Sequence, residues 1–233
     1  NTLALKFVLS RSTVSQPIYP RSGSEFTVSV QLTPPYSLWD GKDYKSTALS
    51  EQERYNWIEF HKWMLKGQWF TPLTRNGNLV LMARAEMGYL GHYNKNKVSP
   101  FERFEVGGDG MTGYNMYGID IISMRGYDDG ALDPVGSNYS CAYNKYTMEL
   151  RYPLLLKGQT NIYVLGFLEG GNGFTSWKEF SPFKIKRSAG IGVRLFLPVV
   201  GMVGVDWGWG FDPAAGQTKR SGSHIHFTMG MQF

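Results

Sequence analysis

The chain has 233 residues, 18% of them charged, and a formal net charge of +5. Its Lys and Arg residues are scattered and form no basic helix or patch, so nucleic-acid binding is not expected. No run of about 18 apolar residues is present, which excludes a transmembrane helix, although the mean hydropathy of −0.29 alone would suggest a water-soluble protein. The single cysteine, Cys141, excludes an internal disulfide.

Apolar and polar residues alternate along most of the chain, which is the pattern of strands with one apolar and one polar face. In chain order, the segments that we predict to be strands are 3–12, 24–33, 56–71, 78–90, 143–153, 161–172, 187–198, 202–211 and 223–233. Several reach the roughly 9–11 residues that a tilted membrane-spanning strand needs. Lys62 and Lys66 interrupt the apolar face of 56–71, so the orientation of that strand stays open.

The connections between these segments alternate between short and long. The short ones, rich in Pro or Gly, are 17–23, 72–77, 153–159 and 198–201, and the long ones are 34–55, 91–142, 173–186 and 212–222. Barrels of bacterial outer membranes have short periplasmic turns and longer extracellular loops. This alternation therefore predicts that the short connections and the C-terminus are periplasmic.

The last segment alternates strictly and finishes on an aromatic residue. One face carries Ile225, Phe227, Met229, Met231 and Phe233, and the other carries His224, His226, Thr228, Gly230 and Gln232. Because soluble domains usually finish in a polar, disordered tail, this ending suggests a strand held at a membrane interface.

These patterns predict an all-β fold, namely a transmembrane antiparallel β-barrel with lipid outside and a polar lumen inside. Nine strands is an odd number, whereas bacterial single-chain barrels have even numbers, so further strands are expected. A soluble β-sandwich is the alternative. It would explain the alternation but neither the terminal aromatic residue nor the alternating loop lengths.

Four motifs resemble the BamA family of outer-membrane β-barrel assembly factors. They are Met124-Arg125-Gly126-Tyr127, Tyr19-Pro20-Arg21-Ser22-Gly23, the run from Phe101 to Gly108, and Gly230-Met231-Gln232-Phe233. The resemblance extends over nearly all of the chain, in order. It implies that residues 1–233 are about nine C-terminal strands of a sixteen-stranded barrel domain, with a long extracellular loop at about 91–142 that enters the lumen. The family's N-terminal strands and periplasmic POTRA domains would be absent from this sequence.

The resemblance implies a non-enzymatic insertase in the outer membrane of a Gram-negative bacterium, with neither cofactor nor metal. Its partners would be unfolded outer-membrane proteins, accessory assembly lipoproteins and outer-membrane lipids. In this family a lateral seam opens at the last strand, which implies seam and terminal-signal roles for Ile225, Phe227, Met229, Gly230, Met231 and Phe233. The alternative within the same superfamily is a two-partner-secretion pore that transports polypeptide through its lumen.

Gly230 matches the position at which the last strand of the family kinks inward, which would remove hydrogen bonds from the seam. The other interpretation of Gly230 is a closely packed position beneath a lumen side chain.

The loop 91–142 is too long to be a passive connection, and its apolar residues indicate that it folds back into the barrel. Arg125 stays charged when buried, so it needs acidic partners on the lumen wall. Glu149 and Glu169 face that wall and lie where the resemblance implies such partners. With the hairpin centred near residue 157, Glu169 would lie about 13 Å further out than Glu149, so Arg125 is expected to reach only one of them well.

Within the same motif, Gly126 is expected to provide a positive φ or a close backbone approach, and Tyr127 to pack in the lumen. Met124 completes the motif. The alternative is that Arg125 is a solvated loop residue.

Other motifs are weaker. Residues 108–113 match GxGxxG, but no strand–helix unit surrounds them. His224 and His226 could supply two zinc ligands without an evident third, which favours two polar lumen residues. The group Asp128, Asp129 and Asp133 matches no EF-hand spacing. An outer-membrane protease or lipase, with His224 or His226 as the base beside Asp206, is the enzymatic alternative.

Overall fold

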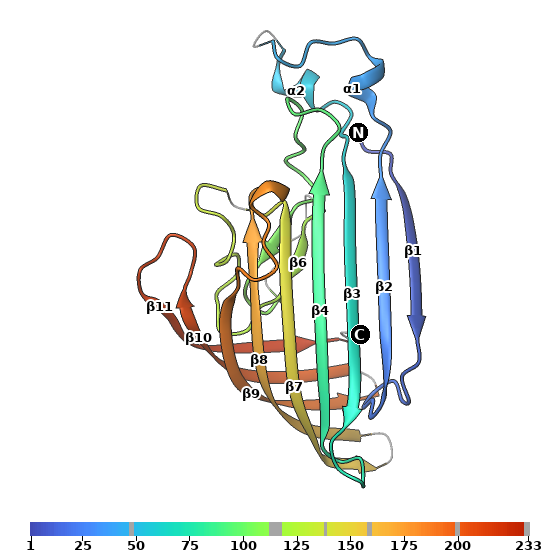
Figure 1. The fold of residues 1–233 in the computed structure, drawn as a ribbon, viewed down its shortest axis with the longest axis vertical. Helices are drawn as coiled ribbons and strands as arrows, with labels where there is room; N and C mark the ends of the chain where they lie inside the picture. Colours follow the sequence, from blue (N-terminus) through green and yellow to red (C-terminus); the bar gives the residue numbers. More distant parts are fainter. Residues whose placement is uncertain (47–48, 112–117, 138, 158–159, 199–200, 231–233) are drawn as a thin grey trace.

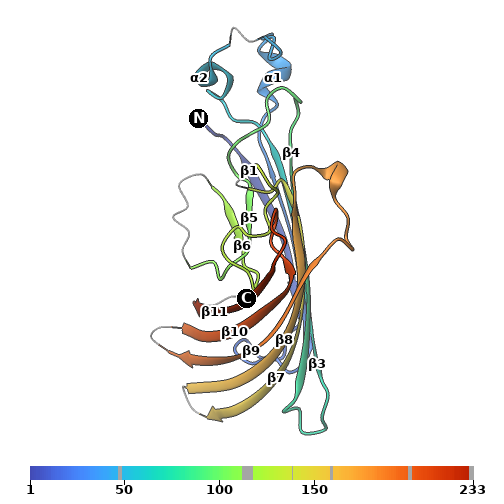
Figure 2. The same cartoon turned by 90° about the vertical axis from the view of Figure 1, so that its left-hand side faces the viewer.

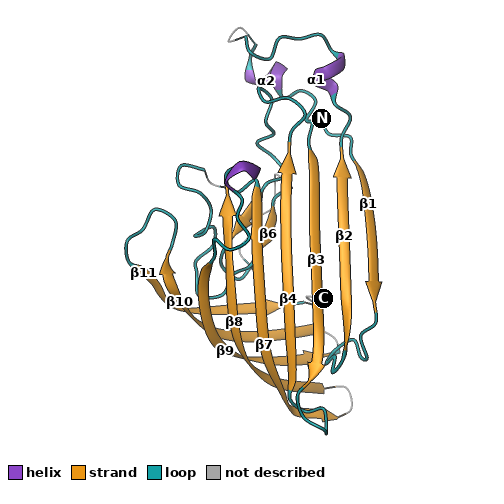
Figure 3. Cartoon of the chain, viewed as in Figure 1, coloured by secondary structure: helices purple, strands orange, loops and turns teal. Residues whose placement is uncertain are grey.

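The computed structural model describes residues 1–46, 49–111, 118–137, 139–157, 160–198 and 201–230, and about half of them form one curved antiparallel sheet of nine strands (Figures 1 and 3). The strands are β1 (Leu5–Ser12), β2 (Gly23–Leu32), β3 (His61–Pro72), β4 (Val80–Gly91), β7 (Ala142–Lys157), β8 (Thr160–Phe174), β9 (Lys186–Leu197), β10 (Gly201–Pro213) and β11 (Arg220–Met229). They pair in this order, so β1 and β11 are the two edges. The nine predicted strands are all present.

Shorter elements occupy the connections. They are α1 (Tyr36–Trp39), α2 (Glu51–Arg54), the 3₁₀ helix η1 (Trp177–Glu179), and a small parallel pair of strands, β5 (Phe104–Val106) and β6 (Asp120–Ile122). The prediction placed the start of β3 at residue 56, which is too early. Residues 56–60 lie outside the sheet, because the chain leaves α2, which a capping box of Ser50 and Glu53 begins, and reaches β3 only at His61.

The two faces of the sheet differ as the alternation predicts. The outer face exposes apolar side chains on every strand from β7 to β11, including Leu150, Leu168, Ile191, Trp207 and Ile225. The inner, concave face carries buried polar and charged side chains such as Lys145, Glu149 and Arg194. It also holds a buried apolar cluster near the short turns, formed by Tyr19, Phe70, Val80, Met82, Tyr163, Leu165 and Phe167. Among the described residues, no helix is both long and apolar enough to cross a membrane.

The orientation of β3, which the sequence left open, is shown by the position of Lys62. Lys62 is buried on the inner face, where its Nζ lies 2.6 Å from Asp120 Oδ2 and 3.4 Å from Glu102 Oε2 of the long loop. Trp63 and Leu65 are exposed on the outer face.

The long loop between β4 and β7 folds against the concave face of the sheet (Figure 2). Its apolar side chains form a buried cluster with the upper part of the sheet, consisting of Phe60, Leu90, Phe104, Val106, Ile122, Met124, Tyr127, Leu132 and Tyr143. This cluster confirms that the loop folds inward. Three further residues of the loop on which the prediction of inward folding rested, Tyr114, Met116 and Tyr117, lie outside the described residues.

The short β1–β2 connection also folds onto the concave face. Tyr19 is only 2% exposed and packs edge-on against Tyr163, with ring centroids 5.2 Å apart. The Tyr19 hydroxyl lies within hydrogen-bonding distance of two carbonyl oxygens, those of Asn78 (2.9 Å) and Arg151 (3.0 Å). This turn therefore ties the two hairpins β3–β4 and β7–β8 together at the end of the sheet that carries the short turns.

We expect Tyr19→Phe to lower the free energy of unfolding by about 1 kcal/mol, because buried carbonyls lose a donor. Tyr19→Ala should cost about 3–5 kcal/mol because it also leaves a cavity. Urea unfolding of the full-length protein in nanodiscs, followed by tryptophan fluorescence, measures both changes. Tyr152→Phe, on the exposed outer face, is the matched control. Equal effects of Tyr19→Phe and Tyr152→Phe would contradict this role for the turn.

Candidate functional site

The motif Met124–Tyr127 is held by a short bridge within the long loop. The Met124 N–H donates to Gly108 O (2.9 Å), and the Gly108 N–H donates to Tyr127 O (3.2 Å). Gly107 and Gly108 have φ of +142° and +66°, conformations that side chains disfavour. The glycine pair thus permits the turn that fixes the motif against the rest of the loop.

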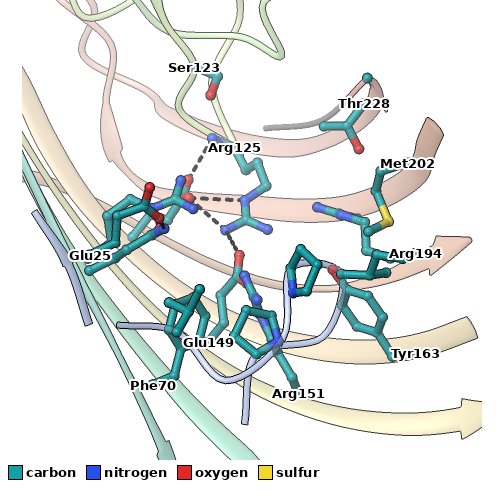
Figure 4. A pocket seen from close by; sticks show the side chains of 18 of the residues that line it. Glu25, Phe70, Ser123, Arg125, Glu149, Arg151, Tyr163, Arg194, Met202 and Thr228 are labelled. Atoms are coloured by element: carbon teal, nitrogen blue, oxygen red, sulfur yellow. Dashed lines mark hydrogen bonds and ion pairs between the residues drawn. The ribbon is translucent and has the colours of Figure 1, made fainter. Parts of the chain in front are cut away.

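Arg125 reaches from this loop to the inner face of the sheet (Figure 4). Its Nη2 lies 2.7 Å from Glu149 Oε1 and 2.6 Å from Glu169 Oε1, and its Nε donates to Glu169 Oε1 at 3.1 Å. Its backbone N–H donates to Glu169 Oε2 at 2.9 Å, and its guanidinium lies 3.7 Å from the centroid of the Phe167 ring. Arg125 is 7% exposed, so it is not a solvated loop residue.

The expectation that Arg125 reaches only one glutamate is wrong. Glu149 pairs with Phe167 and Thr147 pairs with Glu169, which centres the hairpin at residue 158 instead of 157. When the centre of a hairpin moves by one residue, the residue that pairs with a given position on the other strand changes by two. The two glutamates are therefore only about 7 Å apart along the strands, and their side chains bring both Oε1 atoms to the same Nη2 of Arg125.

Further charges surround this contact. Arg151 donates to Glu149 Oε2 (2.8 Å from Nε), and Arg194 forms two hydrogen bonds with Asp206 (2.8 and 2.6 Å). Asp206 Oδ1 also lies 3.7 Å from Arg125 Nη1. Three arginines and three carboxylates, counting Glu169, thus neutralise one another in the interior. A cavity of about 280 Å³ borders the group, with the β1–β2 turn on its wall.

The charge of Arg125 is strongly favoured. Burial by itself disfavours it, but Glu169 and Glu149 outweigh burial and hold the pKa of Arg125 above its usual range. Arg125 is therefore a permanent cation at any physiological pH, and the contact is not a pH switch.

Gly126 lies directly on the backbone of β10. Its φ is +86°, and an added Cβ would lie 2.9 Å from Gly210 N. Its N–H donates to Nε2 of His226 on β11 at 2.8 Å. The expected positive φ and close approach are both present. The role of His226 was missed: alternation places it in the lumen, but nothing in the sequence identifies Gly126 as its donor.

Tyr127 and Met124 are fully buried, as expected for a motif packed against the sheet. The Tyr127 hydroxyl donates to Arg187 O of β9 at 2.9 Å. The four motif residues therefore connect the loop to β7, β8, β9 and β11.

The predicted seam residues lie on β11 and just after it. The side chains of Ile225, Phe227 and Met229 are 55–65% exposed on the outer face. Gly230 has a φ of +99°, yet its N–H still donates to Met202 O at 2.9 Å, so the ladder with β10 continues there. An added Cβ at Gly230 would meet nothing within 4 Å, which excludes the closely packed interpretation. Met231 and Phe233 lie outside the described residues.

The other candidate sites are occupied by structural contacts. His224 Nδ1 lies 3.1 Å from Asp128 Oδ1, and Asp133 accepts from Ser140 Oγ and from the Val106 N–H. Within the described part of the chain, no three His, Cys, Asp or Glu residues form a group that could hold a metal ion. Asp206, the proposed partner of a histidine base, is bound by Arg194 instead.

An antiparallel sheet that is apolar outside and charged inside, with a loop anchored on its inner face, defines part of an outer-membrane β-barrel. The sequence profile of the Omp85 superfamily domain matches residues 1–233. The chain therefore belongs to the Omp85 superfamily.

Comparison with solved structures gives the same fold. The chain is similar to BamA from Haemophilus ducreyi lacking POTRA domains 1–3, with a TM-score of 0.64 and 18% sequence identity. The match covers 96% of this chain and 41% of the solved BamA chain, so this chain spans about two fifths of that solved chain. It has the fold of the C-terminal portion of a BamA-like barrel. No curated protein sequence matches.

We expect Arg125→Ala to lower the stability of the folded protein by about 3–5 kcal/mol, because it leaves buried carboxylates without their cation. Arg125→Lys should recover only part of the loss, since an ammonium cannot reproduce the forked contacts. Urea unfolding of the full-length protein in nanodiscs gives the values. Arg187→Ala, which removes an exposed pair with Asp212, is the control and should change little. Wild-type stability of Arg125→Ala would contradict the anchoring role.

A second prediction concerns Asp133 in the loop before β7. Burial raises the pKa of Asp133 to about 7, so the folded state keeps a proton that the unfolded chain releases near pH 4. Stability should therefore fall as the pH rises from about 4 to 7 and then level off. In Asp133→Asn this contribution is absent, so the stability of the variant relative to wild type should increase over the same interval. Unfolding at pH 5 and pH 8 measures it, and an equal difference at both values would contradict the assignment.

Proposed function

We propose that this chain is the C-terminal part of a non-enzymatic outer-membrane insertase of a Gram-negative bacterium, which assembles β-barrel proteins through a lateral seam at β11. The observation that carries the proposal is the attachment of one loop to both the rigid wall and the edge strand. Arg125 binds glutamates on β7 and β8, while the next residue, Gly126, donates to His226 on β11. A latch between wall and seam strand is what controlled lateral opening requires.

In this mechanism an unfolded outer-membrane protein adds a strand to the edge that is exposed when the seam at β11 opens, and backbone hydrogen bonds supply the affinity. No cofactor and no catalytic side chain is needed, because no covalent bond changes. Ile225, Phe227 and Met229 face the lipid, and Gly230, with its positive φ, allows the chain beyond β11 to turn away from the strand direction. Met231 and Phe233 complete the proposed terminal signal.

The proposed orientation puts the short turns and the C-terminus in the periplasm and the loop with β5 and β6 at the extracellular side. Unfolded substrates and accessory lipoproteins would then approach from the periplasmic side, and outer-membrane lipids would contact the apolar outer face.

The test locks the seam in the full-length protein. In a Cys141→Ser background, Ile225→Cys is paired with a cysteine on the first strand of the barrel. In the matched control it is paired with Trp207→Cys, its neighbour in the β10–β11 register. Insertion of a urea-unfolded outer-membrane protein into proteoliposomes is followed by heat-modifiable gel migration. We expect the seam disulfide to abolish insertion, a reductant to restore it, and the control disulfide to have little effect.

Undiminished insertion by the seam-locked protein would overturn the lateral mechanism. If the locked protein instead carries an unfolded soluble polypeptide across the membrane, the two-partner-secretion type of pore replaces the insertase.

A further inference from the structure

The connection between β8 and β9, residues 175–185, lies on the convex outer side of the sheet, opposite the long loop (Figure 2). The ring of Trp177 in this connection contacts the ring of Tyr89 on β4, with centroids 5.1 Å apart. Tyr89 pairs with Trp63, whose side chain is exposed on the outer face, so Tyr89 belongs to that face as well. Both β8 and β9 have described strands as neighbours on each side, so the place of this connection does not depend on strands outside this chain.

The connection is packed onto the strands beneath it. Asn144 on β7 is fully buried, and its Nδ2 donates to Ser181 O at 2.8 Å. Ile185 lies over Gly170 of β8, where an added Cβ would be 2.9 Å from Ile185 Cδ1. Leu168, two residues earlier on the same face, is 58% exposed. The connection therefore covers β8 from about 7 Å beyond its last exposed apolar residue, which is the boundary of the apolar outer face.

The exposed surface of the connection combines aromatic rings with positive charge. Phe183 is 89% and Trp177 is 55% exposed. Lys178 and Lys184, each next in sequence to one of these rings, are exposed too, and neither forms an ion pair within the described part of the chain. Residues 175–186 contain three lysines and only one acidic residue. Aromatic rings and ammonium groups at the edge of a lipid-facing surface fit an amphiphile whose headgroup is anionic.

The height of the connection indicates which part of a lipid it meets. Phosphate groups are the first charged groups beyond the acyl chains, and lysine binds phosphate as a point charge. In the proposed orientation the connection lies at the extracellular side, where the outer leaflet of a Gram-negative outer membrane carries lipid A, an acylated sugar with phosphate groups. This choice of leaflet rests on the proposed function and its orientation.

We propose that residues 175–185 bind lipid A of the outer leaflet. Phe183 and Trp177 lie against its acyl chains, and Lys178 and Lys184 bind its phosphate groups. The bound lipid holds the wall strands β7 to β9 at a fixed depth in the membrane, because the connection is packed on β7 and continuous with β8 and β9. The seam at β11 lies two strands away from β9 and stays free to move.

The test measures lipid binding to the full-length protein in detergent by native mass spectrometry, which resolves single bound lipids. The probes are diphosphoryl lipid A, lipid A from which both phosphates have been removed, and phosphatidylglycerol, an anionic phospholipid. Heat-modifiable gel migration verifies that each variant is folded.

The double variant Lys178→Gln/Lys184→Gln removes the two charges, and Phe183→Ser removes the most exposed ring. The matched control is Lys45→Gln/Lys95→Gln, because these two lysines are exposed in other connections at the same end of the sheet. It changes the net charge of the protein by the same amount, so a difference between the two double variants reports the position of the lysines.

We expect wild type to bind diphosphoryl lipid A at least about tenfold more tightly than either other probe. The Lys178→Gln/Lys184→Gln variant should lose most of this preference, since each lysine near a charged headgroup contributes about fivefold in affinity. Phe183→Ser should weaken both forms of lipid A by a similar factor, because the ring contacts acyl chains and not phosphate. The Lys45→Gln/Lys95→Gln control should match wild type.

A full preference for diphosphoryl lipid A in Lys178→Gln/Lys184→Gln would overturn the proposed site. Equal or tighter binding of phosphatidylglycerol by wild type would overturn lipid A as the occupant and count against the proposed orientation. The seam-locked protein separates this proposal from the insertase function, since it should bind lipid A as wild type does. Failed insertion with intact lipid A binding would therefore count against the insertase alone.

Discussion

The site depends on one constraint, that a buried guanidinium must be neutralised where it lies. Arg125 cannot lose its proton, so its loop is stable only where carboxylates meet it on the inner face of the sheet. Glu149 and Glu169 provide them from adjacent strands, and both are themselves in contact with further cations. Without Arg125 the two glutamates would lose the cation that they share, and without the glutamates the loop would bury an uncompensated charge. The contact therefore specifies one position for a loop that has few other regular elements.

Close backbone approach supplies the second part of this specification. Gly126 lies on β10 where Gly208 and Gly210 face inward, and a Cβ at any of the three would meet backbone atoms of the other side. Glycine on both surfaces brings main chain against main chain, so the Gly126 N–H can reach His226 on the next strand. The ion pairs of Arg125 with Glu149 and Glu169 determine where on the sheet the loop lies, and the three glycines determine how closely its backbone approaches β10.

The strands could be predicted because a half-buried strand repeats every two residues, and that period is written in the sequence. The acidic partners of Arg125 could also be named, because the chemistry of a buried arginine leaves few choices and the family resemblance pointed to the same positions. How far apart Glu149 and Glu169 lie along the strands could not be predicted, since that distance depends on which residue is the centre of the β7–β8 hairpin. Misplacing the centre by one residue shifts the pairing on the facing strand by two residues. The orientation of β3 required the positions of Glu102 and Asp120 in a loop without any period.

Hydrogen bonds between the long loop and β11 that involve a backbone N–H could not be predicted from the sequence for the same reason. The donor to His226 is a main-chain N–H, and the donor to Asp109 is another, and every residue except proline carries one. These two contacts nevertheless join one loop to adjacent residues of β11, to His226 through its side chain and to Phe227 through its backbone N–H. In the proposed mechanism, β11 cannot move away from the wall without moving this loop, and the loop cannot move without disturbing the contacts of Arg125 with Glu149 and Glu169. Opening of the proposed seam is therefore coupled to release of the loop that carries Arg125.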